Sequence, residues 1–174
     1  ISYFQQVLGY ALTGDVREQV LFVLHGSGAN GKTTAVNAVR DALGPDYSKE
    51  AAPELLLAKR FDTHPTERAD LFGMRFVSTI EVAEGRHLAE ALVKSLTGGD
   101  AVSARRMRED FWTFTPTHKL FLACNYLPDI SGTDHAIWRR IKVIPFNVTI
   151  PPERFRFEAP PGVEVKDRDA GGGK

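Results

Sequence analysis

The segment from Gly26 to Thr33 constrains this chain more than any other, because its residues prescribe a turn, a following helix and a class of ligand. It reads GSGANGKT and places four residues between Gly26 and the run Gly31-Lys32-Thr33, which is the complete phosphate-loop pattern. An apolar run, Val20 to Leu24, precedes it, and helical spacing of apolar residues follows. Since this pattern requires a strand before it and a helix after it, the local context is the expected one.

Each position of this loop has a chemical reason. Glycines allow backbone angles that let successive N–H groups surround phosphate oxygens, and the following helix adds its positive end. Lys32 can reach the outer phosphates, and the Thr33 hydroxyl can ligate Mg²⁺. We therefore predict that ATP and Mg²⁺ bind here, with contacts from Gly26, Ser27, Gly28, Ala29, Asn30, Gly31, Lys32, Thr33 and Thr34. The loop alone does not choose among kinases, GTPases and motors.

The remaining segments alternate between strand-like and helix-like patterns. Apolar spacing predicts helices over 2–13, 33–43 and 87–96, with shorter ones near 53–57 and 66–71. Buried strands are expected at 20–24, 75–80, 120–124 and 141–146, and a hairpin over 101–114. Strands interleaved with helices favour a mostly parallel sheet covered on both faces. We expect an α/β three-layer sandwich with an inserted β-hairpin.

The chain is expected to form one domain over residues 1–150, opened by a helix within 1–14. Residues 151–174 are rich in proline, glycine and charge and should form a poorly ordered tail. The closing residues, DRDAGGGK, and a start inside a helical pattern lead us to expect a domain cut from a longer protein. No apolar run approaches the roughly 20 residues that cross a bilayer, and no secretion signal is visible.

Charge and cysteine content narrow the possible partners. The 22 basic and 22 acidic side chains give no net charge, so any contact with nucleic acid must come from a local cluster. Arg105, Arg106 and Arg108 form one. The single cysteine, Cys124, excludes an internal disulfide and a cysteine-cluster metal site, and a reducing, cytoplasmic setting is expected.

Acidic and amide side chains follow two of the predicted strands. Phosphoryl transfer needs an acidic group near the magnesium ion and the attacking water. Glu81, directly after the strand at 75–80, is the first choice, either through a metal-bound water or by orienting the attacking water. Glu84 is the second choice, although it could instead cap or solvate the next helix. Asn125 closes the strand at 120–124, where its amide could hold a water or a γ-phosphate oxygen, and asparagine is also common in turns.

These blocks arrive in an order that closely resembles the helicase domain of phage and plasmid primase-helicases, a family of helicase superfamily 3 within the AAA-like ATPases. The resemblance covers about residues 2–150 and is carried by GSGANGKTT, STIEVAEGRHLAEALVKSLTGGDAVSARRM, PTHKLFLACN and GTDHAIWRRIKVIPF. It implies nucleotide and magnesium contacts at Lys32 and Thr33, an acidic role at Glu81 and γ-phosphate sensing at Asn125. Many relatives have two adjacent acids at the strand end, so the division of labour between Glu81 and Glu84 stays open.

The resemblance also implies how such a domain would work. Arg139 and Arg140 look like the arginine-finger region, which in such rings reaches the nucleotide of the adjacent subunit. The segment 94–114 resembles the block that bears a DNA-contacting hairpin, so Arg105, Arg106 and Arg108 would face single-stranded DNA in a homo-oligomeric, hexameric ring. A primase domain in the full-length protein and a bacterial host of a phage, prophage or plasmid are further implications.

Several alternatives remain on the sequence alone. A phosphate-loop kinase of a small molecule or nucleotide would use the segment 105–108 as a lid, but it leaves Asn125 and the arginine pair unexplained. A non-catalytic fragment that binds nucleotide or DNA is the other rival. Arg139 and Arg140 could be ordinary surface residues, and the aromatic pair Phe111-Trp112 could either stack on bases or pack within the hairpin.

Overall fold

A five-stranded sheet forms the centre of the computed structural model, which describes residues 2–58, 65–80, 83–149 and 151. Its strands are β1 (Leu21–His25), β2 (Ser48–Glu50), β3 (Phe76–Ile80), β6 (Lys119–Cys124) and β7 (Ile141–Pro145). They lie in the order β2-β3-β6-β1-β7, and every neighbouring pair is parallel. Because β6 lies between β1 and β3, the segments that follow these three strands meet at one edge of the sheet.

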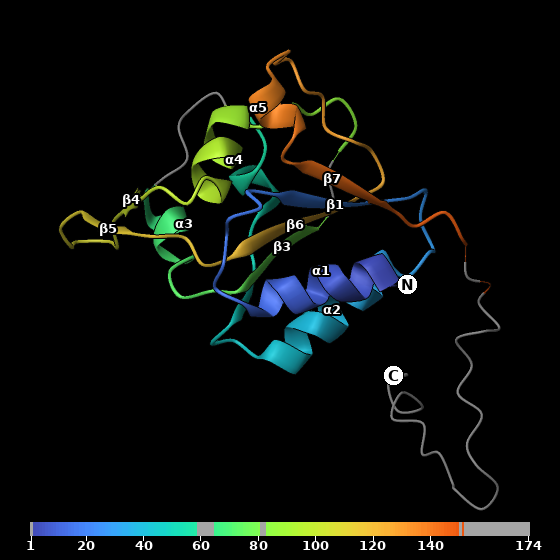
Figure 1. Cartoon of the computed structure of the whole chain (residues 1–174), viewed down its shortest axis with the longest axis horizontal. Helices are drawn as coiled ribbons and strands as arrows, with labels where there is room; N and C mark the ends of the chain where they lie inside the picture. Colours follow the sequence, from blue (N-terminus) through green and yellow to red (C-terminus); the bar gives the residue numbers. More distant parts are fainter. Residues whose placement is uncertain (1, 59–64, 81–82, 150, 152–174) are drawn as a thin grey trace, which may run out of the picture.

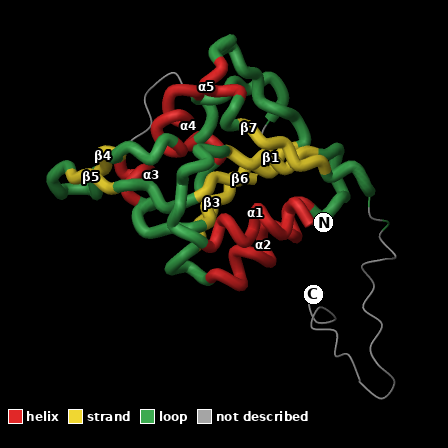
Figure 2. Tube along the Cα trace, in the orientation of Figure 1, coloured by secondary structure: helices red, strands yellow, loops and turns green. Residues whose placement is uncertain are grey.

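Helices cover both faces of this sheet (Figures 1 and 2). On one face lie α1 (Ser2–Leu12) and α2 (Lys32–Leu43), side by side, and on the other lie α4 (Glu90–Thr97) and α5 (His135–Trp138). The short elements η1 (Pro53–Leu55) and α3 (Pro65–Ala69) complete the helices of the described residues. This arrangement confirms the predicted three-layer α/β fold with a parallel sheet.

β1 and β6 read as nearly continuous apolar runs because both of their faces are buried. Successive residues of β1 point to opposite faces: Leu21 and Val23 join the cluster under α4 and α5, whereas Phe22 and Leu24 join the cluster under α1 and α2. β6 is buried along its whole length, in the same alternation. Three aromatic rings tie the central strands together: Phe121 stacks on Phe76 at 4.2 Å and on Phe22 at 5.1 Å between ring centroids.

The inserted hairpin is also confirmed. β4 (Val102–Ala104) and β5 (Trp112–Phe114) pair in antiparallel fashion, and they project from the body at the left of Figure 1. The predicted tail falls on residues 151–174, of which only Pro151 lies within the described part of the chain. No helix in that described part combines the length and apolarity needed to span a bilayer.

Three elements differ from the sequence prediction. The helix expected from residue 87 begins at Glu90, because the Leu88 N–H donates to the Asp129 carbonyl at 2.8 Å and Leu88 forms a β-bridge with Leu57. α5 lies in a segment expected to be a loop, and the Asp134 carboxylate caps it by accepting from the Ile137 N–H at 3.0 Å. β2 was not predicted either, since its sequence, SKE, has no apolar pattern.

We predict that Phe121→Ala lowers the free energy of unfolding by about 3–5 kcal/mol, because it removes the central ring of the three-ring stack and leaves a cavity between the strands that carry the loop ends. Urea denaturation measures this loss. Tyr47→Ala, at an aromatic residue that is 53% exposed, should change the same quantity by about 0.5 kcal/mol or less. Equal effects of the two substitutions would contradict the packing described.

Candidate nucleotide site

The phosphate-loop pattern forms a turn between β1 and α2, as predicted. Gly28, Ala29 and Gly31 have φ angles of 111°, 46° and 80°, in the left-handed region that glycine adopts easily and alanine adopts only with strain. Gly31 is the N-cap of α2 and makes no side-chain cap hydrogen bond. The first N–H groups of α2 therefore have no capping side chain, and a helix start of this kind favours an anion.

Gly26 starts the loop at a point where a side chain has no room. A Cβ at this position would lie 2.2 Å from both the Asn30 Nδ2 and the Phe146 carbonyl oxygen. The Asn30 amide donates to that same carbonyl at 2.7 Å, and the Phe146 N–H donates to the His25 carbonyl at 2.7 Å. The loop is thus fixed to the residue that follows β7.

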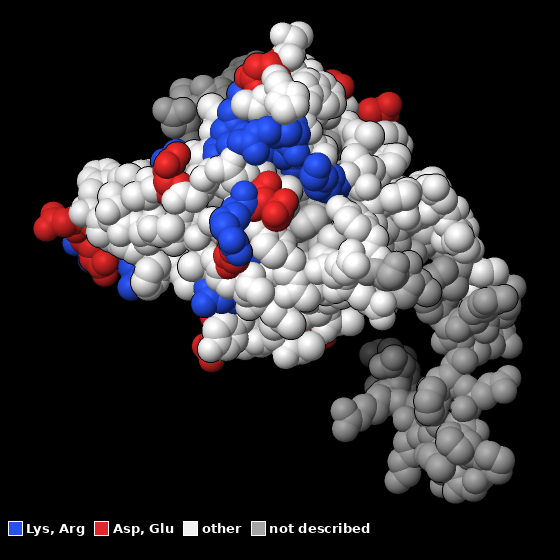
Figure 3. All heavy atoms as spheres, viewed as in Figure 1, with Lys and Arg blue, Asp and Glu red and all other residues white. Residues whose placement is uncertain are grey.

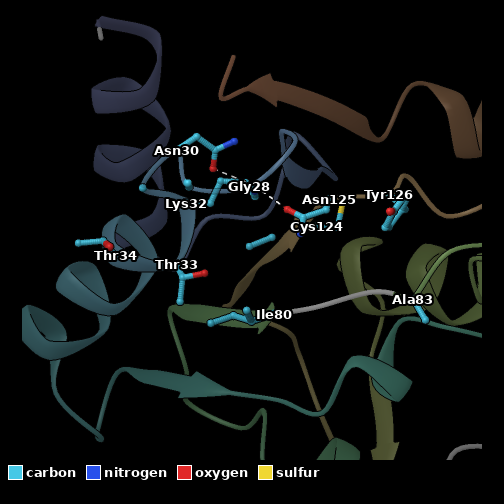
Figure 4. Close-up of a pocket in the computed structure, with 13 residues that line it drawn as sticks. Gly28, Asn30, Lys32, Thr33, Thr34, Ile80, Ala83, Cys124, Asn125 and Tyr126 are labelled. Carbon is cyan, nitrogen blue, oxygen red and sulfur yellow. Dashed lines mark hydrogen bonds between the residues drawn. The ribbon is translucent and has the colours of Figure 1, made fainter. Parts of the chain in front are cut away.

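The Lys32 ammonium lies at the centre of the site (Figure 4). Its Nζ donates to the Gly26 carbonyl at 2.7 Å, to Asn30 Oδ1 at 2.9 Å and to Asn125 Oδ1 at 2.9 Å. Lys32 is 6% exposed, and this burial lowers the pKa of its ammonium from the usual value. A lysine ammonium has three donors, so the three contacts occupy all of them.

A cavity of about 550 Å³ opens above the loop, within the usual size range of small-molecule sites. The loop, the start of α2 and the ends of β3 and β6 line it, with Gly28, Ala29, Asn30, Gly31, Lys32, Thr33, Thr34, Ile80, Ala83, Ala123, Cys124, Asn125 and Tyr126. The structure therefore brings Lys32, Thr33 and Asn125 to the same cavity, as predicted. Lys32 and Asn125 are 93 positions apart in the sequence. Tyr126 was missed by the sequence reasoning, since an aromatic residue after a strand carries no specific signal.

Of the two acidic candidates, Glu81 and Glu84, only Glu84 lies within the described residues. Glu81 lies outside the described residues, although Ile80 and Ala83 on either side of that gap line the cavity. Glu84 is exposed and does not line it. Among the described residues, no group of three or more histidine, cysteine, aspartate or glutamate side chains could hold a metal ion. The Thr33 hydroxyl is exposed at the cavity, where a side-chain oxygen could ligate Mg²⁺ together with phosphates and water.

Cys124 lines the cavity from the end of β6 but is 1% exposed. Burial raises the pKa of its thiol to about 11, so the side chain stays protonated at neutral pH. Cys124 is therefore a small core residue at the floor of the cavity.

Arg139 and Arg140 lie near the amino ends of β1 and β7, whereas the phosphate loop follows the carboxyl end of β1. Arg140 directly precedes β7, and its carbonyl accepts from the Leu21 N–H at the start of β1. With a rise of 3.3 Å per residue, the positions level with Arg140 and with Gly26 are about 20 Å apart along β1. Neither arginine lines the cavity of its own chain.

The two arginines differ in their surroundings. Arg140 is 7% exposed, and its guanidinium donates to the Ala136 carbonyl at 2.6 Å, to Thr97 Oγ1 at 3.2 Å and to Gln19 Oε1 at 3.3 Å. Arg139 is exposed and donates to the same Gln19 oxygen. Figure 3 shows that basic side chains gather on the surface beside α4 and α5. Gln19 was missed by the sequence reasoning, because nothing in its neighbourhood in the sequence marks it.

The three hairpin arginines lie in the loop between β4 and β5 and do not line the cavity. Arg106 and Arg108 are exposed. Arg105 is half-buried, with its guanidinium carbon 4.8 Å from the centroid of the Phe111 ring. The structure thus separates two sets of predicted residues, one at the cavity and one on the projecting hairpin.

Residues 24–140 match the protein family described as "Family of unknown function (DUF5906)". The chain is 37% identical over 147 residues to a protein of Acanthamoeba polyphaga mimivirus named "Putative helicase L207/L206", and 27% identical over 137 residues to an African swine fever virus protein named "Putative primase C962R". These matches cover 83% and 78% of this chain, but the chain spans only 15% and 14% of those proteins. The predicted resemblance to helicase and primase proteins is confirmed, with viruses as the source of these relatives.

A solved structure supports the fold independently. The apo structure of the NrS-1 C-terminal region superimposes with a TM-score of 0.59 at 17% identity, over 82% of this chain and 34% of that one. At this level of identity the likeness concerns the fold.

We predict that Gly26→Ala weakens the binding of a fluorescent ATP analogue and lowers the free energy of unfolding by about 1–3 kcal/mol, because the new methyl group overpacks against Asn30 and Phe146. Titration and urea denaturation measure the two effects. Gly9→Ala is the matched control, since nothing lies within 4 Å of the added Cβ; in a helix it should stabilise the protein by up to about 1 kcal/mol. Unchanged nucleotide affinity in Gly26→Ala would contradict this account of the loop.

Proposed function

This chain belongs to the family described as DUF5906, and from that premise we propose that it is the ATP-hydrolysing motor of a viral replication helicase that moves along single-stranded DNA as a ring. The observation that carries the proposal is the Lys32 ammonium, held between the phosphate loop and Asn125 inside a cavity of nucleotide size. Helicase-named viral relatives support the same conclusion.

The residues of the cavity have complementary tasks in ATP hydrolysis. The triphosphate lies in the loop, and its outer oxygens replace protein oxygens as acceptors for the Lys32 ammonium, which releases the Asn125 amide. The released amide then contacts the γ-phosphate or the attacking water. The Thr33 hydroxyl would hold Mg²⁺, which would supply positive charge beside the phosphates. Glu81, with Glu84 as the second candidate, orients the water.

An arginine from a neighbouring copy completes the site in this proposal. Arg139 is the better candidate of the two, because it is exposed, whereas Arg140 is buried by three hydrogen-bonded groups. Neither can serve the cavity of its own chain across about 20 Å of sheet. A guanidinium that stabilises the transferring phosphoryl group is worth about 10³–10⁵ in rate, so an isolated copy should hydrolyse ATP slowly.

The geometry does not support the lid that the kinase alternative requires. A lid must close over the phosphates, but the segment 105–108 belongs to a hairpin that projects from the body (Figure 1) and contributes no residue to the cavity. ATP hydrolysis measured with and without single-stranded DNA distinguishes the non-catalytic alternative from a motor.

We predict that ATP hydrolysis by this protein is stimulated by single-stranded DNA and that Lys32→Ala lowers the hydrolysis rate by about 10²–10³, since it removes a donor aimed at the transferring phosphoryl group. Phosphate release with and without an oligonucleotide measures both. Lys49→Ala is the matched control, because Lys49 forms an ion pair with Asp70 away from the cavity. Activity that survives in Lys32→Ala would refute the site, and activity without DNA stimulation would point to a different substrate.

We further predict that Arg139→Ala alone hydrolyses ATP about 10³-fold more slowly than the wild type, and that mixing it with Lys32→Ala restores activity. In the mixture, an intact phosphate loop of one variant meets an intact Arg139 of the other. The controls are each variant alone at the same total protein concentration. If the mixture is no more active than the sum of its parts, a shared site is excluded.

A further inference from the structure

The end of the hairpin combines aromatic and charged residues in a way that the nucleotide site does not use. Ala104 pairs with Trp112 at the last rung of the two strands, so residues 105–111 form the connecting loop. This loop includes the exposed residues Met107 and Phe111. Its backbone turns at Arg108, which has a φ of 64°.

The aromatic residues of the hairpin have two different environments. Trp112 and Phe114 pack with Phe72 in a three-ring cluster, with centroids 5.0 Å apart for Phe72–Trp112, 5.7 Å for Phe72–Phe114 and 5.3 Å for Trp112–Phe114. These rings hold the hairpin to the segment after α3. Phe111 lies outside this cluster and is 59% exposed. Trp112 therefore packs within the hairpin, whereas the Phe111 ring remains available for a contact with another molecule.

Arg105 supports the exposed ring. Its guanidinium lies over the Phe111 ring at 4.8 Å, a cation–π contact that orients the ring and leaves more than half of the residue open. An arginine in this position is less free to follow a phosphate backbone than Arg106 and Arg108, which are exposed.

Charge alone gives this loop little affinity for DNA. Residues 105–110 contain three arginines and two acids, Glu109 and Asp110, so their net charge is three minus two, or one positive. Figure 3 shows acidic and basic side chains beside one another at the end of the hairpin. A contact that does not depend on charge would therefore contribute a large share of the binding energy.

We propose that Phe111, supported by the Arg105 guanidinium, is a stacking platform for one nucleobase of single-stranded DNA, while Arg106 and Arg108 contact the adjoining phosphates. The inference rests on the proposed function and names the contact that its hairpin makes. Because every base has a flat π-face, such a platform accepts any sequence, as a protein that moves along a strand requires.

The test compares two oligonucleotides of equal length: oligothymidine, and a strand of abasic nucleotides with the same phosphates and no bases. Wild-type protein should bind oligothymidine about 5-fold to 150-fold more tightly than the abasic strand, the range expected for stacking of one base. Phe111→Ala should lose this preference and bind both strands like the wild type binds the abasic one. Phe111→Trp should keep the preference, and Phe111→Leu, which is apolar without a π-face, should lose most of it.

Two controls separate stacking from other effects. Tyr3→Ala removes an aromatic residue that is 50% exposed on α1 and should leave both affinities unchanged. Arg106→Ala should reduce the dependence of binding on salt concentration, whereas Phe111→Ala should keep it, since counterion release follows phosphate contacts. The far-UV circular dichroism spectrum should be the same for Phe111→Ala and the wild type, which shows that the variant is folded.

The outcomes distinguish this inference from the function on which it rests. Wild-type protein that binds both strands equally, or a Phe111→Ala variant that keeps the preference for oligothymidine, overturns the platform and leaves the DNA motor intact. Wild-type protein that binds neither strand overturns both.

Discussion

The contact of the Lys32 ammonium with three protein oxygens is the interaction on which the rest of the site depends. Gly26 and Asn30 supply two of these oxygens from the loop, and Asn125 supplies the third from the residue after β6. Burial disfavours a charged ammonium, so these contacts compensate for the water that it has lost. They also define what a ligand must offer. A phosphate group can replace them because its oxygens carry more negative charge than an amide or a peptide carbonyl, whereas a neutral ligand would gain little from the exchange.

The order of the strands turns this local contact into a site. β6 lies between β1 and β3, and in parallel sheets the carboxyl ends of the strands form the crevice where ligands bind. Asn125 is therefore placed between the phosphate loop and the end of β3. The opposite edge of the same sheet carries Arg139 and Arg140 beside Gln19. One copy thus presents the phosphate loop at one edge and a guanidinium at the other, an arrangement suited to head-to-tail association.

The sequence predicts the parts of this fold that depend on local pattern. The phosphate loop, the four apolar strands and the long helices follow from residue types and spacing within short windows. β2 escapes prediction because its residues Ser48–Glu50 are polar and its strand character comes from pairing with β3. The start of α4 is shifted because Leu88 pairs with Leu57 and hydrogen-bonds to Asp129. The burial of Arg140 and its link to Gln19 are likewise tertiary, since 121 positions separate the two residues. The sequence therefore identified Arg139 and Arg140 as candidates but could not show that one is exposed and the other buried.

β7 links the two ends of the sheet that carry the arginine pair and the phosphate loop. Arg140 directly precedes this strand, and its carbonyl accepts a hydrogen bond from the Leu21 N–H at the start of β1. Phe146 directly follows the strand; its N–H donates to the His25 carbonyl, and its carbonyl accepts from the Asn30 side-chain amide. Between these ends, each residue of the strand is in register with β1. The segment 140–146 therefore connects the arginine pair directly to the residue that holds the phosphate loop.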